Sequence, residues 1–334
     1  MDLVVLCTVE AGLDSISVVL SSGHKIKAII SLNPADKDLS LISGLVDVKA
    51  FAEKWEIPHF YVSSYSLSSI EDKRLLLSLE YDILWVSGWQ RLLPKWAIEH
   101  AKIGAIGGHG SPDGVRQGRG RSPQNWSLLL GCNDFHVSLF LLRPGIDDGD
   151  ILDTATFKYN PQDDIKISYK KNSLCIGRMM SNLLSNPDFI NKAVPQSGEA
   201  QYFPQRLPED GLIDWNLPGQ IISRLCRALT KPYPGMFAMF DNIQVSIWRC
   251  QYFDNGKYQP GSIFHVFNDG QFLVGCGDGL MLVEDFSANS HWVPEVGFCF
   301  QSGNFKSQIK EIVRRHNDKH PELMINTRVL NLLR

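Results

Sequence analysis

The stretch Tyr81–Ile106, YDILWVSGWQRLLPKWAIEHAKIGAI, decides the fold. Its two ends, YDILWV and KIGAI, are short apolar runs of the length that strands usually have. Between them, PKWAIEHA opens on a proline, which is common at the first position of a helix. A strand, a helix and a second strand in this order predict a βαβ unit with two parallel strands.

The same alternation extends toward the N-terminus. Strand-like runs at 3–8, 27–32 and 57–62 alternate with helical spacing of apolar residues at 13–22 and 45–55. We therefore expect an α/β fold with a doubly wound, mostly parallel, Rossmann-like sheet. The first turn, CTVEAGL, lacks the GxGxxG pattern, so the sequence does not predict a dinucleotide site.

The pattern changes after about residue 200. A helix is expected at 217–229, and PYPG then interrupts the chain. Short β-like runs separated by glycine, aspartate and asparagine follow from 236 to 300, which favours a small, OB-like β-barrel. We therefore expect a catalytic domain at 1–200, a barrel domain at 201–305 and a C-terminal helix within 306–334.

Composition excludes several classes of protein. With 334 residues, 44% of them hydrophobic, the chain has the size and apolar content of about two globular domains. A formal net charge of −3 does not favour a nucleic-acid partner, because proteins that bind the phosphate backbone are more often basic. No apolar run is long enough to span a membrane, and MDLVVLCTVEAG reads as a strand, not a secretion signal. The seven scattered cysteines contain no CxxC pair, which predicts no metal site, no disulfide framework and a cytoplasmic location.

A polar loop follows the second strand of the βαβ unit. It reads GGHGSPDGVRQGRGRSPQNW from 107 to 126, with His109 directly after two glycines. A histidine can exchange a proton near neutral pH, and glycines let the backbone approach a reacting group closely. The acidic segment PGIDDGDIL follows at 144–152.

These two segments resemble the signature of the folate-dependent formyltransferases. A third segment, LPEDGLIDWNLPGQIISRLCRALTKPYPGMF at 207–237, is similar to the start of the barrel domain of that family. The family includes methionyl-tRNA formyltransferase, the sugar N-formyltransferases and the formyltransferase half of the bacterial aminoarabinose-pathway enzyme. The HGS and PQNW forms are more similar to the sugar enzymes.

The resemblance implies roles for named residues. His109 would carry the proton transfers, and Asp147, the first aspartate of a DxGD-like motif, would orient its imidazole. The co-substrate would be 10-formyltetrahydrofolate. The residues implied in its binding are Ser87, Gly88, Trp89, Gln90, Arg91, Leu92 and Ile146, and those implied on the acceptor side are Gly107, Gly108, Ser111, Arg119 and Asn125.

One position departs from the family pattern. The family has asparagine two residues before the histidine, where this chain has Gly107. That asparagine is expected to donate a hydrogen bond to the developing oxyanion, and the loss of one such donor costs roughly 10²- to 10³-fold in rate. Asn125, the backbone of the double glycine or a water molecule could take its place.

Each assignment has a structural alternative. A single histidine at a strand end is usually structural, and Asp147, Asp148 and above all Asp150 could simply shape a turn. Arg116, Arg119 and Arg121 could bind phosphate or lie in solvent. Trp89 and Leu92 could be ordinary packing residues.

The expected function is transfer of a formyl group to a primary amine, most simply that of a nucleotide-linked amino sugar. Other acceptors remain open: an amino acid, a peptide intermediate or methionyl-tRNA. The segment 33–44, NPADKDLSLISG, lacks a basic insertion, which counts against tRNA. A homologue that binds ligands without turnover is the alternative that Gly107 supports, and a homodimer is compatible with the chain.

Overall fold

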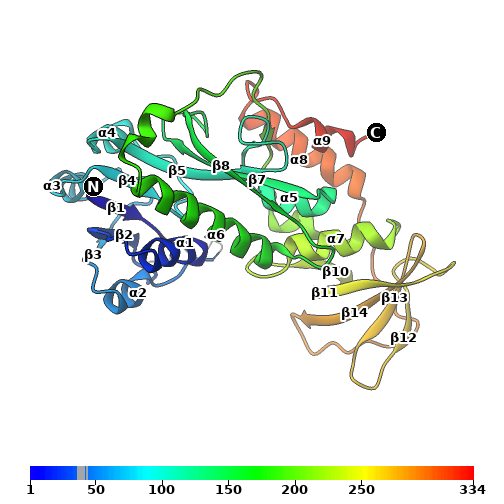
Figure 1. The fold of residues 1–334 in the computed structure, drawn as a ribbon. Helices are drawn as coiled ribbons and strands as arrows, with labels where there is room; N and C mark the ends of the chain where they lie inside the picture. The colour runs from blue at the N-terminus through cyan, green and yellow to red at the C-terminus, as the bar shows by residue number, and fades with distance from the viewer. Residues whose placement is uncertain (36–41, 43) are drawn as a thin grey trace. The chain divides into compact units, whose positions relative to one another are not determined.

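The computed structural model describes residues 1–35, 42 and 44–334 (Figure 1), so most of the segment 33–44 lies outside the described residues. The chain divides into two compact units. The first contains residues 1–119, 134–158 and 169–200, and the second contains 120–133, 159–168 and 201–334. The boundary expected at residue 200 coincides with one edge of these units. Two earlier segments and the C-terminal helix group with the barrel residues.

The first unit is built on a seven-stranded sheet. Its first five strands pair in parallel, and the sixth pairs antiparallel with both of its neighbours. In spatial order the strands are β3 (His59–Val62), β2 (Ala28–Leu32), β1 (Leu3–Leu6), β4 (Ile83–Val86), β5 (Gly104–Ser111), β7 (Asp134–Leu141) and β8 (Ile151–Lys158). The central strands read LVVL and AIISL and are buried at every position, as parallel strands covered on both faces require. This order confirms the doubly wound, mostly parallel sheet.

Helices cover both faces of this sheet. Its helical segments are α1 (Glu10–Ser21), α2 (Val48–Lys54), α3 (Ile70–Ser78), α4 (Lys95–His100) and η2 (Pro187–Lys192), and α6 (Ile165–Leu184) enters the unit from residue 169. Leu76 of α3 and Ala97 of α4 share one core cluster with Val4, Leu6 and Ala105 of the strands. On α1, the Ala11 carbonyl accepts a hydrogen bond from Ser173 Oγ of α6 at 2.8 Å.

The crevice at the switch point of this sheet is closed. The strand order reverses between β1 and β4, where open α/β sheets usually bind their ligands. Here the backbone N–H and the hydroxyl of Thr8 both donate to the Gly88 carbonyl, at 3.3 and 2.8 Å. A Cβ at Gly12 would lie 2.3 Å from the Ser87 carbonyl oxygen, so the two segments are in backbone contact. The first open strand end lies one strand further on, at β5.

The second unit contains a five-stranded antiparallel sheet whose edges are joined. In spatial order its strands are β10 (Met236–Phe240), β11 (Ile243–Asn255), β14 (Gly279–Ala288), β13 (Phe272–Cys276) and β12 (Ile263–Val266). Ile263 of β12 donates its N–H to the Phe298 carbonyl at 2.7 Å, and Gln301 donates to the Met239 carbonyl of β10 at 2.8 Å. Residues 298–301 therefore link the two edge strands, which is the closure that a small barrel needs.

The remaining elements of the second unit are short. They are α5 (Pro123–Leu130), η3 (Pro208–Gly211), α7 (Gly219–Leu229), α8 (Phe305–Lys319), α9 (Thr327–Asn331) and β9 (Tyr202–Phe203), which pairs with Gly120 of β6 (Arg119–Gly120). Within the described residues, no helix has the length and apolar character to cross a membrane.

The closed crevice predicts that Gly12→Ala is destabilising. The new methyl group would meet the Ser87 carbonyl oxygen at 2.3 Å and Cys7 Sγ at 2.6 Å. We expect the free energy of unfolding to fall by about 1–3 kcal/mol, the usual cost of overpacking. Urea denaturation measures this, with Ser21→Ala on the exposed end of the same helix as a control that should change stability by less than about 0.5 kcal/mol. An unchanged midpoint for Gly12→Ala would contradict the closed crevice.

Candidate functional site

The site begins where β5 extends past its parallel neighbour. Val86, the last residue of β4, pairs with Gly107, and β5 continues to Ser111. On its other side β5 stays paired with β7, with His109 opposite Ser138. Because side chains alternate along a strand, Ala105, position 107 and His109 face the same side of the sheet. β5 thus carries His109 two residues beyond the end of β4.

Glycines on both sides leave His109 as the main side chain at this strand end. A Cβ at Gly108 would lie 3.0 Å from Ile176 Cδ1, and one at Gly110 would lie 2.4 Å from the Phe135 ring. Neighbouring side chains therefore already occupy the space beside both glycines, and larger residues would push them away. The glycines were expected from sequence to make room around the histidine, and they also let β5 pack closely against its surroundings.

The imidazole of His109 lies between a carbonyl and a carboxylate. Nε2 is 2.7 Å from the Gly118 carbonyl oxygen, which can only accept, so Nε2 carries a proton. Nδ1 is 3.6 Å from Asp147 Oδ2. The two side chains are 13% and 22% exposed, so solvent screens their interaction only in part. A proton on Nδ1 would point toward the Asp147 carboxylate.

The loop that holds Asp147 is tightly constrained. Asp147 has a φ of +49°, in the left-handed region, and a Cβ at Gly149 would lie 1.4 Å from the Leu141 carbonyl oxygen. Asp150 Oδ2 accepts a hydrogen bond from Arg143 Nη2 at 2.7 Å. Asp150 thus serves the turn, as the turn interpretation of this acidic segment expects, while Asp147 faces the histidine.

The segment after β4 lies at the strand end adjacent to β5. Gln90 donates its backbone N–H to Tyr65 Oη at 2.8 Å, and the Arg91 guanidinium lies 5.6 Å from the Tyr65 ring centroid. Trp89 packs edge-on against Tyr65 and is only 7% exposed, whereas Leu92 is 58% exposed. Trp89 therefore belongs to the core, and Gln90, Arg91 and Leu92 present their side chains outward.

Three further positions were expected to contact the folate: Ser87, Gly88 and Ile146. Ser87 is buried, and Gly88 has a φ of +81°, which glycine adopts without strain. Ile146, in the loop just before Asp147, is half-buried.

Three residues expected on the acceptor side have roles in the fold. Ser111 is buried, donates to the Gly114 carbonyl at 2.7 Å and accepts from the Asp113 N–H at 3.1 Å. Arg119 is 4% exposed and donates from Nη2 to Gln196 Oε1 at 2.8 Å. Asn125 belongs to the second unit, where its Nδ2 donates to the Ala228 carbonyl. We therefore leave Ser111, Arg119 and Asn125 out of the acceptor site.

Leu142 fills the space beside Gly107. The φ of Gly107 is not in the left-handed region, and a Cβ there would lie 2.6 Å from Leu142 Cδ2. Leu142 itself packs against the core cluster that contains Trp89 and Leu93. A side chain at position 107 would therefore collide with the side chain of Leu142 and not with backbone atoms.

Three residues at the site escaped the sequence analysis: Tyr65, Leu142 and Gln196. Tyr65 follows the strand-like run at 57–62 by three residues. Because the carboxyl ends of parallel strands lie along the same side of a sheet, this position was a weak sign that Tyr65 lies near the site. Leu142 and Gln196 belong to no motif that the sequence analysis recognised.

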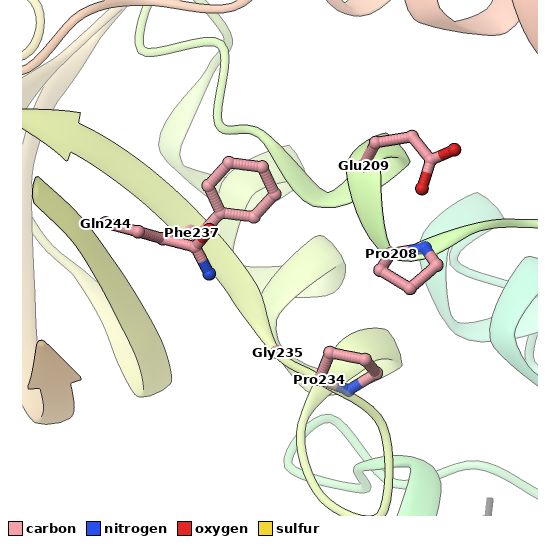
Figure 2. Close-up of a pocket in the computed structure, with 6 residues that line it drawn as sticks. All are labelled: Pro208, Glu209, Pro234, Gly235, Phe237 and Gln244. Carbon is pink, nitrogen blue, oxygen red and sulfur yellow. The ribbon is translucent and has the colours of Figure 1, made fainter. Parts of the chain in front are cut away.

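A hollow of the second unit lies away from these residues. Figure 2 shows it, with a volume of about 220 Å³, lined by Pro208, Glu209, Pro234, Gly235, Phe237 and Gln244. None of the residues assigned from sequence lines it.

Comparison with known proteins identifies relatives of this chain. Residues 207–291 match the family model described as formyl transferase, C-terminal domain. The bifunctional polymyxin resistance protein ArnA of Wigglesworthia glossinidia brevipalpis is 30% identical over 282 residues, which are 83% of this chain and 41% of that protein. The chain therefore spans less than half the length of that relative. A methionyl-tRNA formyltransferase of Citrifermentans bemidjiense is 27% identical over 289 residues, covering 85% of this chain and 88% of the relative.

Solved structures share the fold. HypX from Aquifex aeolicus in complex with tetrahydrofolic acid superposes with a TM-score of 0.59 at 15% identity, over 97% of this chain and 48% of that one. An N-formyltransferase from Helicobacter canadensis, in complex with folinic acid and dTDP-3-aminofucose, gives a TM-score of 0.56 at 16% identity, over 86% and 100% of the two chains. Residues 207–291 thus match the formyl transferase C-terminal domain, and more than four fifths of the chain is similar in sequence to ArnA and to a methionyl-tRNA formyltransferase.

Proposed function

We propose that this protein is an N-formyltransferase that moves a formyl group from 10-formyltetrahydrofolate to a primary amine. The observation that carries the proposal is the His109–Asp147 pair at the open end of β5, in a homologue of the formyltransferases. In the reaction the amine nitrogen bonds to the formyl carbon and loses a proton, and the bond from that carbon to the folate nitrogen breaks. His109 is placed to take the proton from the amine and return it to the leaving nitrogen.

The residues after β4 fit a folate. Tyr65 packs edge-on against the buried Trp89, the Arg91 guanidinium lies 5.6 Å from the Tyr65 ring centroid, and Gln90 and Arg91 carry exposed polar side chains. Such a combination of aromatic and polar groups suits a flat heterocycle with hydrogen-bonding edges. We assign Ser87–Leu92 and Ile146 to this co-substrate, with Leu92 as the exposed apolar contact.

His109 must change its hydrogen bonds to act as a base. In the structure its Nε2 proton points at the Gly118 carbonyl, so Nε2 has no lone pair to offer. The active tautomer would carry the proton on Nδ1, donated to Asp147, which requires the 3.6 Å separation to shorten. Catalytic hydrogen bonds are often long without substrate and tighten in the complex. The amine would then replace the Gly118 carbonyl as the partner of Nε2.

For the acceptor we propose a nucleotide-linked amino sugar. The HGS and PQNW forms in the loop support it, and the Helicobacter canadensis neighbour holds an amino sugar nucleotide. The second candidate is methionyl-tRNA, because methionyl-tRNA formyltransferases are among the sequence relatives. We place the reaction in the cytoplasm, where the free cysteines would stay reduced. Formylation of a panel of nucleotide amino sugars, amino acids and methionyl-tRNA separates these acceptors, and a lack of turnover on every amine would show a binding protein instead.

We expect His109→Ala to abolish formyl transfer in a folded protein and Asp147→Asn to lower kcat by about 10²- to 10⁴-fold. The amide keeps the shape of Asp147 but cannot stabilise an imidazolium. Steady-state kinetics measure both variants, with circular dichroism to confirm folding.

Asp150→Asn is the matched control for Asp147→Asn. It is the same chemical change, three residues away in the same loop, and it weakens only the pairing with Arg143. We expect a clearly smaller loss of kcat. An equal or larger loss would mean that the acidic loop contributes through its shape and not through Asp147.

Gly107→Asn should destabilise the protein by about 1–3 kcal/mol, since Leu142 occupies the space that the new side chain needs. Combining it with Leu142→Ala should recover stability relative to Gly107→Asn alone. In the double variant the added amide donor should raise kcat by roughly 10-fold or more, with little change in folate affinity. Thermal unfolding and kinetics measure these effects. A stable double variant with unchanged kcat would show that another group already stabilises the oxyanion.

A further inference from the structure

We propose that Gln196 is a positioning residue that sets the geometry of the His109–Asp147 pair, an inference that rests on the proposed function. Gln196 lies in the segment 194–198, here named the strap, which no motif of the sequence singled out. The side chain of Gln196 makes three hydrogen bonds. Its Nε2 donates to the carbonyls of Asp147 and Gly149 at 2.9 and 2.8 Å, and its Oε1 accepts from Arg119 at 2.8 Å.

These partners determine which way the amide points. Oxygen and nitrogen of a glutamine side chain can be exchanged without changing its shape, so the orientation must come from its neighbours. Backbone carbonyls only accept and a guanidinium only donates. Each of the three bonds therefore requires the observed orientation.

The bonds of Gln196 complete a ring of contacts around the site. His109 Nε2 donates to the carbonyl of Gly118, and Arg119 is the next residue in the chain. Arg119 bonds to Gln196, Gln196 holds the backbone of Asp147, and Asp147 Oδ2 faces His109 Nδ1 at 3.6 Å. Gln196 thus links the two loops that set the two sides of the imidazole.

The strap itself is held along its length. Val194 and Ile151 exchange both backbone hydrogen bonds at 2.8 Å, which fixes the strap to the first residue of β8. At the other end, Arg116 Nη2 donates to the Gly198 carbonyl. Gln196 sits between these two anchors, so its amide is presented from a fixed backbone. Such preorganisation supports the left-handed conformation of Asp147, whose φ is +49°.

The test compares Gln196→Met with Gln196→Glu. Methionine keeps the length of the side chain and loses all three bonds, whereas glutamate keeps the acceptor for Arg119 and loses both donors. We expect each to lower kcat by roughly 10- to 100-fold, the effect of a misplacement of about 1 Å. The KM for the formyl donor should stay within about twofold, because no folate contact is removed. Gln308→Met is the matched control, since Gln308 Nε2 donates to the Leu212 carbonyl at 2.8 Å in the second unit.

A spectroscopic readout tests the proposal without turnover. Nitrogen-15 NMR of the imidazole, assigned with His109→Ala, reports which ring nitrogen of His109 carries the proton. We expect the Nε2-protonated form in the substrate-free wild type and a mixture of both tautomers in Gln196→Met, where neither the Gly118 carbonyl nor the Asp147 carboxylate is held against the ring. The loss of kcat in this variant would come from the lost placement of Asp147 beside the ring and not from the tautomer itself. If the wild-type protein formylates no amine, the proposed function fails, and this measurement still decides the role of Gln196.

Three results would overturn the proposal. Gln196→Met with wild-type kcat and the wild-type tautomer would show that the ring of contacts is not needed. Full activity of Gln196→Glu would show that the bonds to Asp147 and Gly149 do not position the pair. An equal loss of kcat in Gln308→Met would reveal general loosening of the protein. The positioning role is supported if kcat and the tautomer change together in the Gln196 variants alone.

Discussion

The register of β5 between its two neighbours is the constraint on which the site depends. β4 ends opposite Gly107, while β7 accompanies β5 to Ser111, so one side of the strand is free and the other is held. A strand supported on one side keeps a fixed direction without being buried on both. His109 therefore lies at the carboxyl end of an internal strand, beyond the last residue of β4, and its backbone is part of the central sheet. Catalytic groups on such rigid elements keep their geometry better than groups on loops.

Much of the fold follows from local patterns. Apolar runs with strand length alternate with helical spacing, and this alternation predicts the strands β1 to β5 and their parallel direction. The double glycine before His109 and the acidic loop with Asp147 also lie close together, as their motifs imply. These features could be predicted because each depends on a few neighbouring residues.

The rest depends on contacts between residues far apart in the sequence. Gln196 reaches Asp147 across 49 positions, and Arg119 reaches Gln196 across 77. No local pattern distinguishes such a glutamine from one in solvent. Asn125 belongs to the same polar stretch of sequence as His109, but His109 lies on β5 and Asn125 on α5. The Asn125 amide donates to the carbonyl of Ala228, 103 positions away. The sequence also does not predict that residues 120–133 group with the C-terminal unit.

The closed crevice at the switch point limits how this fold could acquire other ligands. A phosphate that binds at the start of a first helix needs backbone N–H groups open to solvent there. In this chain Gly12 and the Thr8 region are instead in contact with Ser87 and Gly88. A nucleotide site at that position would require the first turn to lengthen and separate from the residues after β4, and those residues are the ones assigned to the folate. A dinucleotide site and the proposed folate site would therefore need different positions of the same backbone segment.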